Sequence, residues 1–264
     1  MTTKTKWALR LVALLYLALL LIVPVGLIFW RTFQHGFSPF WHSITTHEAL
    51  HALRVTLEVA ITATVLNTVF GITASLLIVR HAFPGKRLLN ALIDLPLAVS
   101  PVVAGLALIL IYGRLTPIGG WLGHQGVNVI FALPGMVIAT VFVSLPLVVR
   151  ELVPVLEEIG TEQEQAAWTL GASAPQTFRR ITLPAIRWAL AYGIVLALAR
   201  SLGEFGAVAV VSGKVVGQTQ TLTLYVEQQY QNFDKTGAYA VSVMLAMIAI
   251  VTLIAMTLFR PKER

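Results

Sequence analysis

The chain has 264 residues, of which 57% are hydrophobic and only 12% carry a charged side chain, and its mean hydropathy is +0.80. Soluble domains contain about 25% charged residues, so this chain has too few charges to cover a surface that faces water. The composition excludes a soluble globular enzyme, a disordered protein and a fibre, and it predicts an integral membrane protein. The net charge of +7 does not indicate nucleic acid as a partner, because the basic residues are scattered in small clusters between apolar runs. The chain contains no cysteine, which excludes thiolate chemistry and cysteine-ligated metals.

Six apolar stretches are long enough to cross a bilayer, whose hydrocarbon core of about 30 Å needs about 20 helical residues. They span residues 8–30, 53–79, 88–112, 129–149, 189–211 and 238–259. Basic residues precede the first stretch, as in a signal peptide. However, its apolar part is longer than the roughly 15 residues of a signal peptide, and no cleavage pattern follows it. We therefore expect an all-α membrane protein with about six transmembrane helices, including a retained first helix.

The distribution of basic residues predicts the orientation of these helices. Thirteen of the 19 lysines and arginines flank the stretches on one side, five lie on the other side, and Arg200 lies within a stretch. Cytoplasmic loops carry the excess of basic residues, so both termini are expected in the cytoplasm. This assigns residues 1–52 to the first helix and an outer loop, 53–259 to a transmembrane domain with a cytoplasmic loop at 150–188, and 260–264 to a cytoplasmic tail.

The cytoplasmic loop carries the most specific pattern in the chain. Thr161 followed by Glu164 has the form of a capping box and predicts the start of a helix, and Gly171 suits the left-handed position that ends one. Ser173 and Gln176 repeat the cap pattern and predict a second helix. A short capped helix with small apolar residues fits a groove in another protein. The alternative is a helix that lies flat on the membrane surface.

This loop resembles the signature of bacterial ABC-importer permeases, in which Glu-Ala-Ala is followed after three residues by Gly and, nine residues later, by Ile-x-Leu-Pro. The corresponding residues are Gln165, Ala166, Ala167, Gly171, Ile181, Leu183 and Pro184. The spacing matches throughout, and the one departure is Gln165 in place of the acidic residue. The resemblance implies that these residues form coupling helices that dock on a separate ATP-hydrolysing subunit.

Three segments, one of which lies in this loop, resemble the permeases of sulfate/thiosulfate importers of the CysW type. They are IDLPLAVSPVVAGL at 93–106, GTEQEQAAWTLGAS at 160–173 and LGEFGAVAVVSG at 202–213. The permeases of molybdate or tungstate importers share this layout and stay open as the alternative.

The resemblance implies an ABC importer type I permease in the bacterial inner membrane, which moves the anion by alternating access. It also implies a non-identical second permease chain, two ATP-binding cassette ATPase subunits that hold ATP and Mg, and a periplasmic or extracellular anion-binding protein. This chain itself is expected to be a transporter subunit that contacts membrane lipid, without a cofactor, a metal or catalytic residues.

Ionisable residues inside a span are costly and are by default functional candidates. Arg200 and Glu204 lie four residues apart in the fifth stretch, within reach of each other on one helical face. A positive charge there would compensate an anion in the path; the alternative is a structural ion pair. In the third stretch Asp94 precedes Ser100 and Pro101, where proline interrupts the helix and frees backbone that can line a cavity. The alternative at this point is a kink that serves packing alone.

One motif indicates a different class of protein. His47, Glu48 and His51 form the H-E-x-x-H pattern of zinc metalloproteases, with both histidines on one helical face. Such a site needs a third ligand in a shielded cleft and an open position for water. A short outer loop before the second stretch offers neither, so membrane zinc proteolysis is a remote alternative to transport.

Overall fold

A computed structural model describes residues 3–34 and 36–259, and every regular element within these ranges is helical, as predicted. In chain order the elements are α1 (Thr3–Leu17), the π-helical turn η1 (Ala18–Ile22), α2 (Val23–Phe33), α3 (Phe37–Ile44), α4 (His47–Arg80), α5 (Lys86–Ala98), α6 (Pro101–Tyr112), α7 (Pro117–His124), α8 (Leu133–Ile159), α9 (Glu162–Thr169), α10 (Ala174–Thr177), the π-helical turn η2 (Phe178–Thr182), α11 (Leu183–Leu202), α12 (Gly206–Val211), α13 (Leu222–Gln231) and α14 (Lys235–Phe259). The expected tail at 260–264 lies outside the described residues.

Within the described ranges, five helical stretches are long and apolar enough to cross a membrane, or six if the bent pair α5 and α6 forms one span. The third span is interrupted at Ser100 and Pro101, as predicted, and α5 and α6 meet there at 114°. Ser100 between them is extended with ψ 134°, as the residue before a proline prefers. The expected fifth span was placed too far along the chain: the helix runs over Ala174–Leu202, and α12 follows as a separate element.

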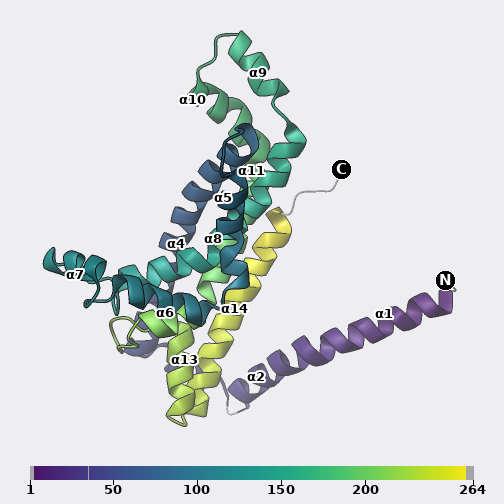
Figure 1. The fold of residues 1–264 in the computed structure, drawn as a ribbon. Coiled ribbons are helices and arrows are strands. Elements are labelled where there is room, and N and C mark those ends of the chain that lie inside the picture. The colour runs from purple at the N-terminus through teal and green to yellow at the C-terminus, as the bar shows by residue number, and fades with distance from the viewer. Residues whose placement is uncertain (1–2, 35, 260–264) are drawn as a thin grey trace.

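The long helices form a bundle (Figure 1). α4, α8 and α11 pack against one another, and α14 packs on α11. α9 and α10 lie beyond one end of this bundle, here called the loop end, whereas α13 lies beside the start of α14 at the opposite end. α6 packs on α12 and lies across the direction of the bundle.

The first span extends away from the bundle (Figure 1). None of the 18 residues in the most apolar part of this span is buried against the other described residues. α2 packs on α3 and α14 only close to the end that carries α13. An apolar surface of this length must be covered by lipid or by another chain.

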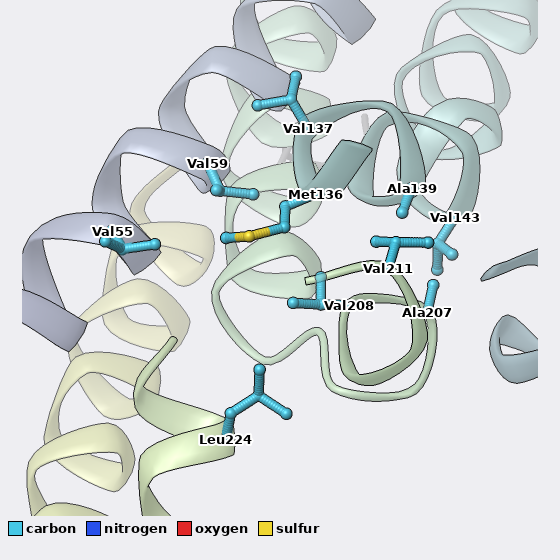
Figure 2. Close-up of a cluster of buried hydrophobic side chains, with 10 residues drawn as sticks. All are labelled: Val55, Val59, Met136, Val137, Ala139, Val143, Ala207, Val208, Val211 and Leu224. Atoms are coloured by element: carbon cyan, nitrogen blue, oxygen red, sulfur yellow. The ribbon is translucent and has the colours of Figure 1, made fainter. Parts of the chain in front are cut away.

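A buried apolar cluster joins four helices next to the interruption between α11 and α12 (Figure 2). It consists of Val55 and Val59 from α4; Met136, Val137, Ala139 and Val143 from α8; Ala207, Val208 and Val211 from α12; and Leu224 from α13. Because α12 contributes three fully or almost fully buried side chains, the break before it is held in a fixed position. A second cluster around Leu152, Leu156 and Ile186 joins α8 to α11 at the loop end.

Polar side chains also connect the central helices. Asn67 of α4 donates a hydrogen bond from Nδ2 to Ser144 Oγ at 2.8 Å and to the carbonyl of Val141 at 3.1 Å. Ser201 of α11 donates to the same Ser144 Oγ at 3.3 Å. Such hydrogen bonds stabilise contacts between helices in lipid, where the hydrophobic effect does not drive helices together.

Gly71 allows α4 and α8 to approach closely. A Cβ built at this position would lie 2.6 Å from Cγ1 and 2.8 Å from Cβ of the buried Val148. Because valine is stiff at χ1, we expect Gly71→Val to destabilise the folded chain by about 1–3 kcal/mol. Thermal unfolding in detergent micelles measures this. Gly26→Val is the matched control, since nothing lies within 4 Å of its Cβ position, and equal losses in the two variants would contradict the packing argument.

Candidate functional site

The loop end presents the signature residues on two short helices. α8 ends at Ile159, α9 follows after Gly160 and Thr161, and α10 begins after Ser173. The two predicted helices and the glycine between them are therefore present. Within the predicted loop 150–188, α8 covers residues 150–159 and a helical stretch starts at Ala174, so residues 160–173 connect the two helices.

α9 exposes most of the signature. Gln165 and Ala166 are exposed, and Ala167 is partly exposed. The apolar side chains of Trp168 and of Leu170, the C-cap residue, are 54% and 88% exposed. Among residues 3–34 and 36–259, Gln165 has no charged partner; its Nε2 donates to Thr161 Oγ1 at 3.0 Å. The exposed apolar side chains of Ala166, Trp168 and Leu170 therefore lie among polar ones such as Glu162 and Gln165 on α9 and its C-cap.

The predicted capping box at the start of α9 is not formed. Thr161 is the N-cap residue, but its side chain makes no cap hydrogen bond. Glu164 instead pairs with Arg80 of α4, with Arg80 Nε and Glu164 Oε2 3.0 Å apart. The Glu164 carboxylate therefore pairs with an arginine that is distant in sequence, and it does not form the predicted cap.

Gly171 adopts the left-handed conformation that was predicted, with φ +85°. The N–H of Ala172 bonds the carbonyl of Ala167 at 3.0 Å, which closes the helix in the manner of a C-terminal glycine motif. The N–H of Ser173 then donates to Oε1 of Gln176 at 2.8 Å, as expected for the second cap.

The Ile-x-Leu-Pro part of the signature lies within a continuous helix. The N–H of Leu183 bonds the carbonyl of Phe178, which makes residues Phe178–Thr182 a π-helical turn. Pro184 lacks the N–H that an α-helix needs, and a π turn is a common way of accommodating that defect. Ile181 lies beside α9, where it lines a small cavity together with Glu164.

Arg200 and Glu204 form the predicted ion pair, with Arg200 Nη1 and Glu204 Oε2 2.6 Å apart. They do not share one helix, because α11 ends at Leu202 and Glu204 lies in the break before α12. Oε1 of Glu204 accepts the backbone N–H of Ala207 at 2.9 Å, which caps α12. The Glu204 side chain is 2% exposed and that of Arg200 is 38% exposed, so Arg200 carries the accessible charge of the pair.

The break between α5 and α6 lies next to the break between α11 and α12. A Cβ added at Gly206 would lie 3.0 Å from Cβ of Pro101, which places the start of α6 next to the start of α12. Ser100 is exposed, and its hydroxyl makes no capping bond. The four path candidates, Ser100, Pro101, Arg200 and Glu204, therefore come from two adjacent helix breaks, which is the arrangement that binding sites in membrane transporters use.

Sequence reasoning missed two ion pairs because their partners are distant along the chain. Asp94 Oδ1 lies 2.8 Å from Arg150 Nη2, which joins α5 to α8. Arg80 and Glu164 join α4 to α9. In the sequence, the only signal was that each acid lies on the side of the membrane where the basic residues gather.

The H-E-x-x-H pattern lies at the start of α4. Thr46 is its N-cap and accepts the N–H of Ala49 at 3.2 Å, so His47, Glu48 and His51 belong to the first turns of a capped helix. Across residues 3–34 and 36–259, no group of three or more histidine, cysteine or acidic residues could hold a metal ion. The geometry gives the protease alternative no support.

The fold and the loop define a class: a multi-pass helical permease with a loop of two short helices at one end. The chain belongs to the family of binding-protein-dependent transport system inner membrane components, whose model matches residues 67–264. This confirms the predicted permease class and places the chain among transport components rather than enzymes.

Two relatives and one solved structure support this assignment. The chain is 48% identical over 253 residues to the sulfate transport system permease protein CysW of Synechocystis sp., covering 96% of this chain and 92% of that protein. It is 39% identical over 235 residues to the sulfate transport system permease protein CysT of Escherichia coli, covering 89% and 85%. A chain of a bacterial ABC transporter involved in alginate import superposes with a TM-score of 0.79 at 18% identity, covering 98% of this chain and 96% of that one. The last match confirms the ABC importer permease fold.

Proposed function

We propose that this chain is the transmembrane permease subunit of an ATP-driven importer that moves sulfate or thiosulfate by alternating access. The observation that carries the proposal is the loop 160–173, which presents the exposed apolar side chains of Trp168 and Leu170 at one end of a membrane bundle. The names of the CysW and CysT relatives support sulfate as the transported anion.

The loop end is proposed to face the cytoplasm and to dock on an ATPase subunit. Trp168 and Leu170 would enter a groove of that subunit, since exposed large apolar side chains on a short helix suit such a groove. ATP and Mg would be bound by two such subunits, not by this chain. Closure of the ATPase pair would displace α9 and open the path outward, and hydrolysis would return it inward.

The complete importer is proposed to contain a second, non-identical permease chain and an anion-binding protein on the outer side. Relatives with two different permease names, CysW and CysT, support a non-identical pair. The unburied first span supports a large contact outside this chain, with the second permease or with lipid. Both termini are proposed to face the cytoplasm, following the distribution of basic residues.

The path is proposed to pass the two helix breaks. Arg200 would compensate part of the charge of the anion, while Glu204 would hold the guanidinium in place. Ser100 would donate a hydrogen bond to an oxygen of the anion. Most of the selectivity would reside in the binding protein, because the path offers few polar groups.

Uptake of radiolabelled sulfate by cells with and without this chain tests the proposal. We expect uptake to be lost on deletion, restored by the gene, and blocked by an excess of thiosulfate but not of molybdate. If deletion left sulfate uptake unchanged and abolished molybdate accumulation instead, the permease class would stand and the proposed substrate would be wrong.

A further inference from the structure

Glu164 differs from its neighbours in α9 because its side chain is buried. It is the one buried residue of this helix, whereas Gln165, Ala166, Trp168 and Leu170 are all exposed. Outside α10 and η2, which adjoin it along the chain, α9 has few contacts with the bundle. Glu164 is therefore the side chain through which α9 makes an ion pair and hydrogen bonds with the other helices.

The partners of Glu164 come from two different helices. Arg80, the last residue of α4, lies with Nε 3.0 Å from Oε2 and donates from Nη2 to Oε1 at 3.3 Å. Thr182 in the turn before α11 donates to Oε1 at 2.7 Å. The side chains of Arg80 and Glu164 are only 11% and 10% exposed. One hydrogen bond and one close ionic contact therefore join the guanidinium to the carboxylate, and the hydrogen bond from Thr182 adds a third connection.

Arg80 also reaches the end of α8. Its Nη1 donates to the carbonyl of Leu156 at 3.0 Å, which is one of the last four carbonyls of that helix and has no partner within it. The cavity between these groups measures about 10 Å³, at the lower limit for holding one water molecule. Solvent therefore has little room to replace the direct contacts between α4, α8, α9 and the start of α11.

We propose that the Arg80–Glu164 ion pair, here called the latch, is the joint that transmits displacement of α9 to α4 and α11. Both residues act as positioning residues: they hold the docking helix and touch neither anion nor nucleotide. Apolar contacts could slide when α9 is pushed, whereas a largely buried ion pair whose carboxylate also accepts a hydrogen bond from Thr182 holds α9, α4 and the turn before α11 together. The inference rests on the proposed coupling role of α9.

A double variant separates the latch from folding. Removing one partner leaves an unpaired buried charge, which destabilises the protein, whereas replacing both with apolar residues is often neutral for stability. We expect Arg80→Met/Glu164→Leu to insert at the wild-type level. In the assembled importer, uptake should fall about tenfold while ATP hydrolysis stays within about twofold, so that more ATP is consumed per anion.

Hydrogen exchange provides a readout that does not depend on transport. In the purified importer, amides of residues 161–170 should exchange faster in the double variant than in the wild type, with α14 unchanged. The control is Glu58→Gln, because Arg54 and Glu58 form an exposed ion pair elsewhere on α4, with side chains 76% and 43% exposed. Unaltered exchange in α9 together with a wild-type ratio of ATP to anion would overturn the latch. If the wild type itself moved no sulfate, the proposed substrate would fail, while the exchange measurement would still decide the latch.

Discussion

Replacing Arg200 with glutamine is expected to lower sulfate uptake at least about tenfold, a change of about 1.4 kcal/mol in the transport barrier. Arg200 carries the accessible charge of its ion pair, at the meeting point of two interrupted helices. An anion inside a membrane protein is costly unless a fixed positive charge or helix terminus compensates it. Glutamine keeps a donor for Glu204 but removes the positive charge. The initial rate of radiolabelled sulfate uptake, divided by the amount of chain in the membrane, measures the effect.

Glu204→Gln distinguishes compensation of the anion from a purely structural pair. The amide oxygen of glutamine can still accept the N–H of Ala207, so the cap of α12 survives, and the charge of Arg200 is left free. If the charge of Arg200 serves the anion, this variant should keep more uptake than Arg200→Gln and lose only the part that depends on Glu204 holding the guanidinium in place. Equal loss of uptake and of thermal stability in both variants would show that the pair only holds the helices together. Arg114→Gln is the control, since Arg114 is exposed and donates a hydrogen bond to Asn128 in the irregular segment before α8.

The spans and the loop could be predicted because their signals are local. Apolar runs of about 20 residues require a helix in lipid, and a glycine followed by a new cap ends one helix and starts another. Gly171 and Ser173 lie where these rules put them. The α5–α6 break also follows a local rule, since Ser100 precedes a proline.

Two predictions were wrong for different reasons. The first failed because a tertiary contact overrides a local preference. The cap pattern assigned Glu164 to Thr161, but a buried arginine from α4 binds that carboxylate in the folded chain. The fifth span was placed by hydropathy at 189–211, although the helix starts at Ala174, before the basic residues Arg179 and Arg180. Hydropathy marks the part of a helix that lies in lipid; it does not mark where the helix ends.

Gly171→Asp is expected to uncouple the importer, reducing uptake at least about tenfold while the chain still inserts and the ATPase subunits still hydrolyse ATP. No atom lies within 4 Å of a Cβ built at Gly171, so the side chain has room and causes no clash within the chain. The expected loss of coupling has two other causes. A residue with a Cβ disfavours φ +85°, and a carboxylate at the C-terminal end of α9 opposes the helix dipole. Both effects act on the surface that is proposed to meet the ATPase.

Two matched variants test this explanation. Gly171→Asn has nearly the same shape and tolerates the left-handed conformation equally well but adds no charge, so it should retain more uptake than the aspartate variant. Gly217→Asp introduces the same residue at φ +71° with nothing within 4 Å, in a loop of the chain remote from α9. Because backbone strain and charge are matched there, it should leave the ratio of ATP hydrolysed to sulfate imported unchanged. If Gly217→Asp raised that ratio as much as Gly171→Asp does, the effect would come from strained glycine positions in general, and the docking role of the α9 surface would lose its support.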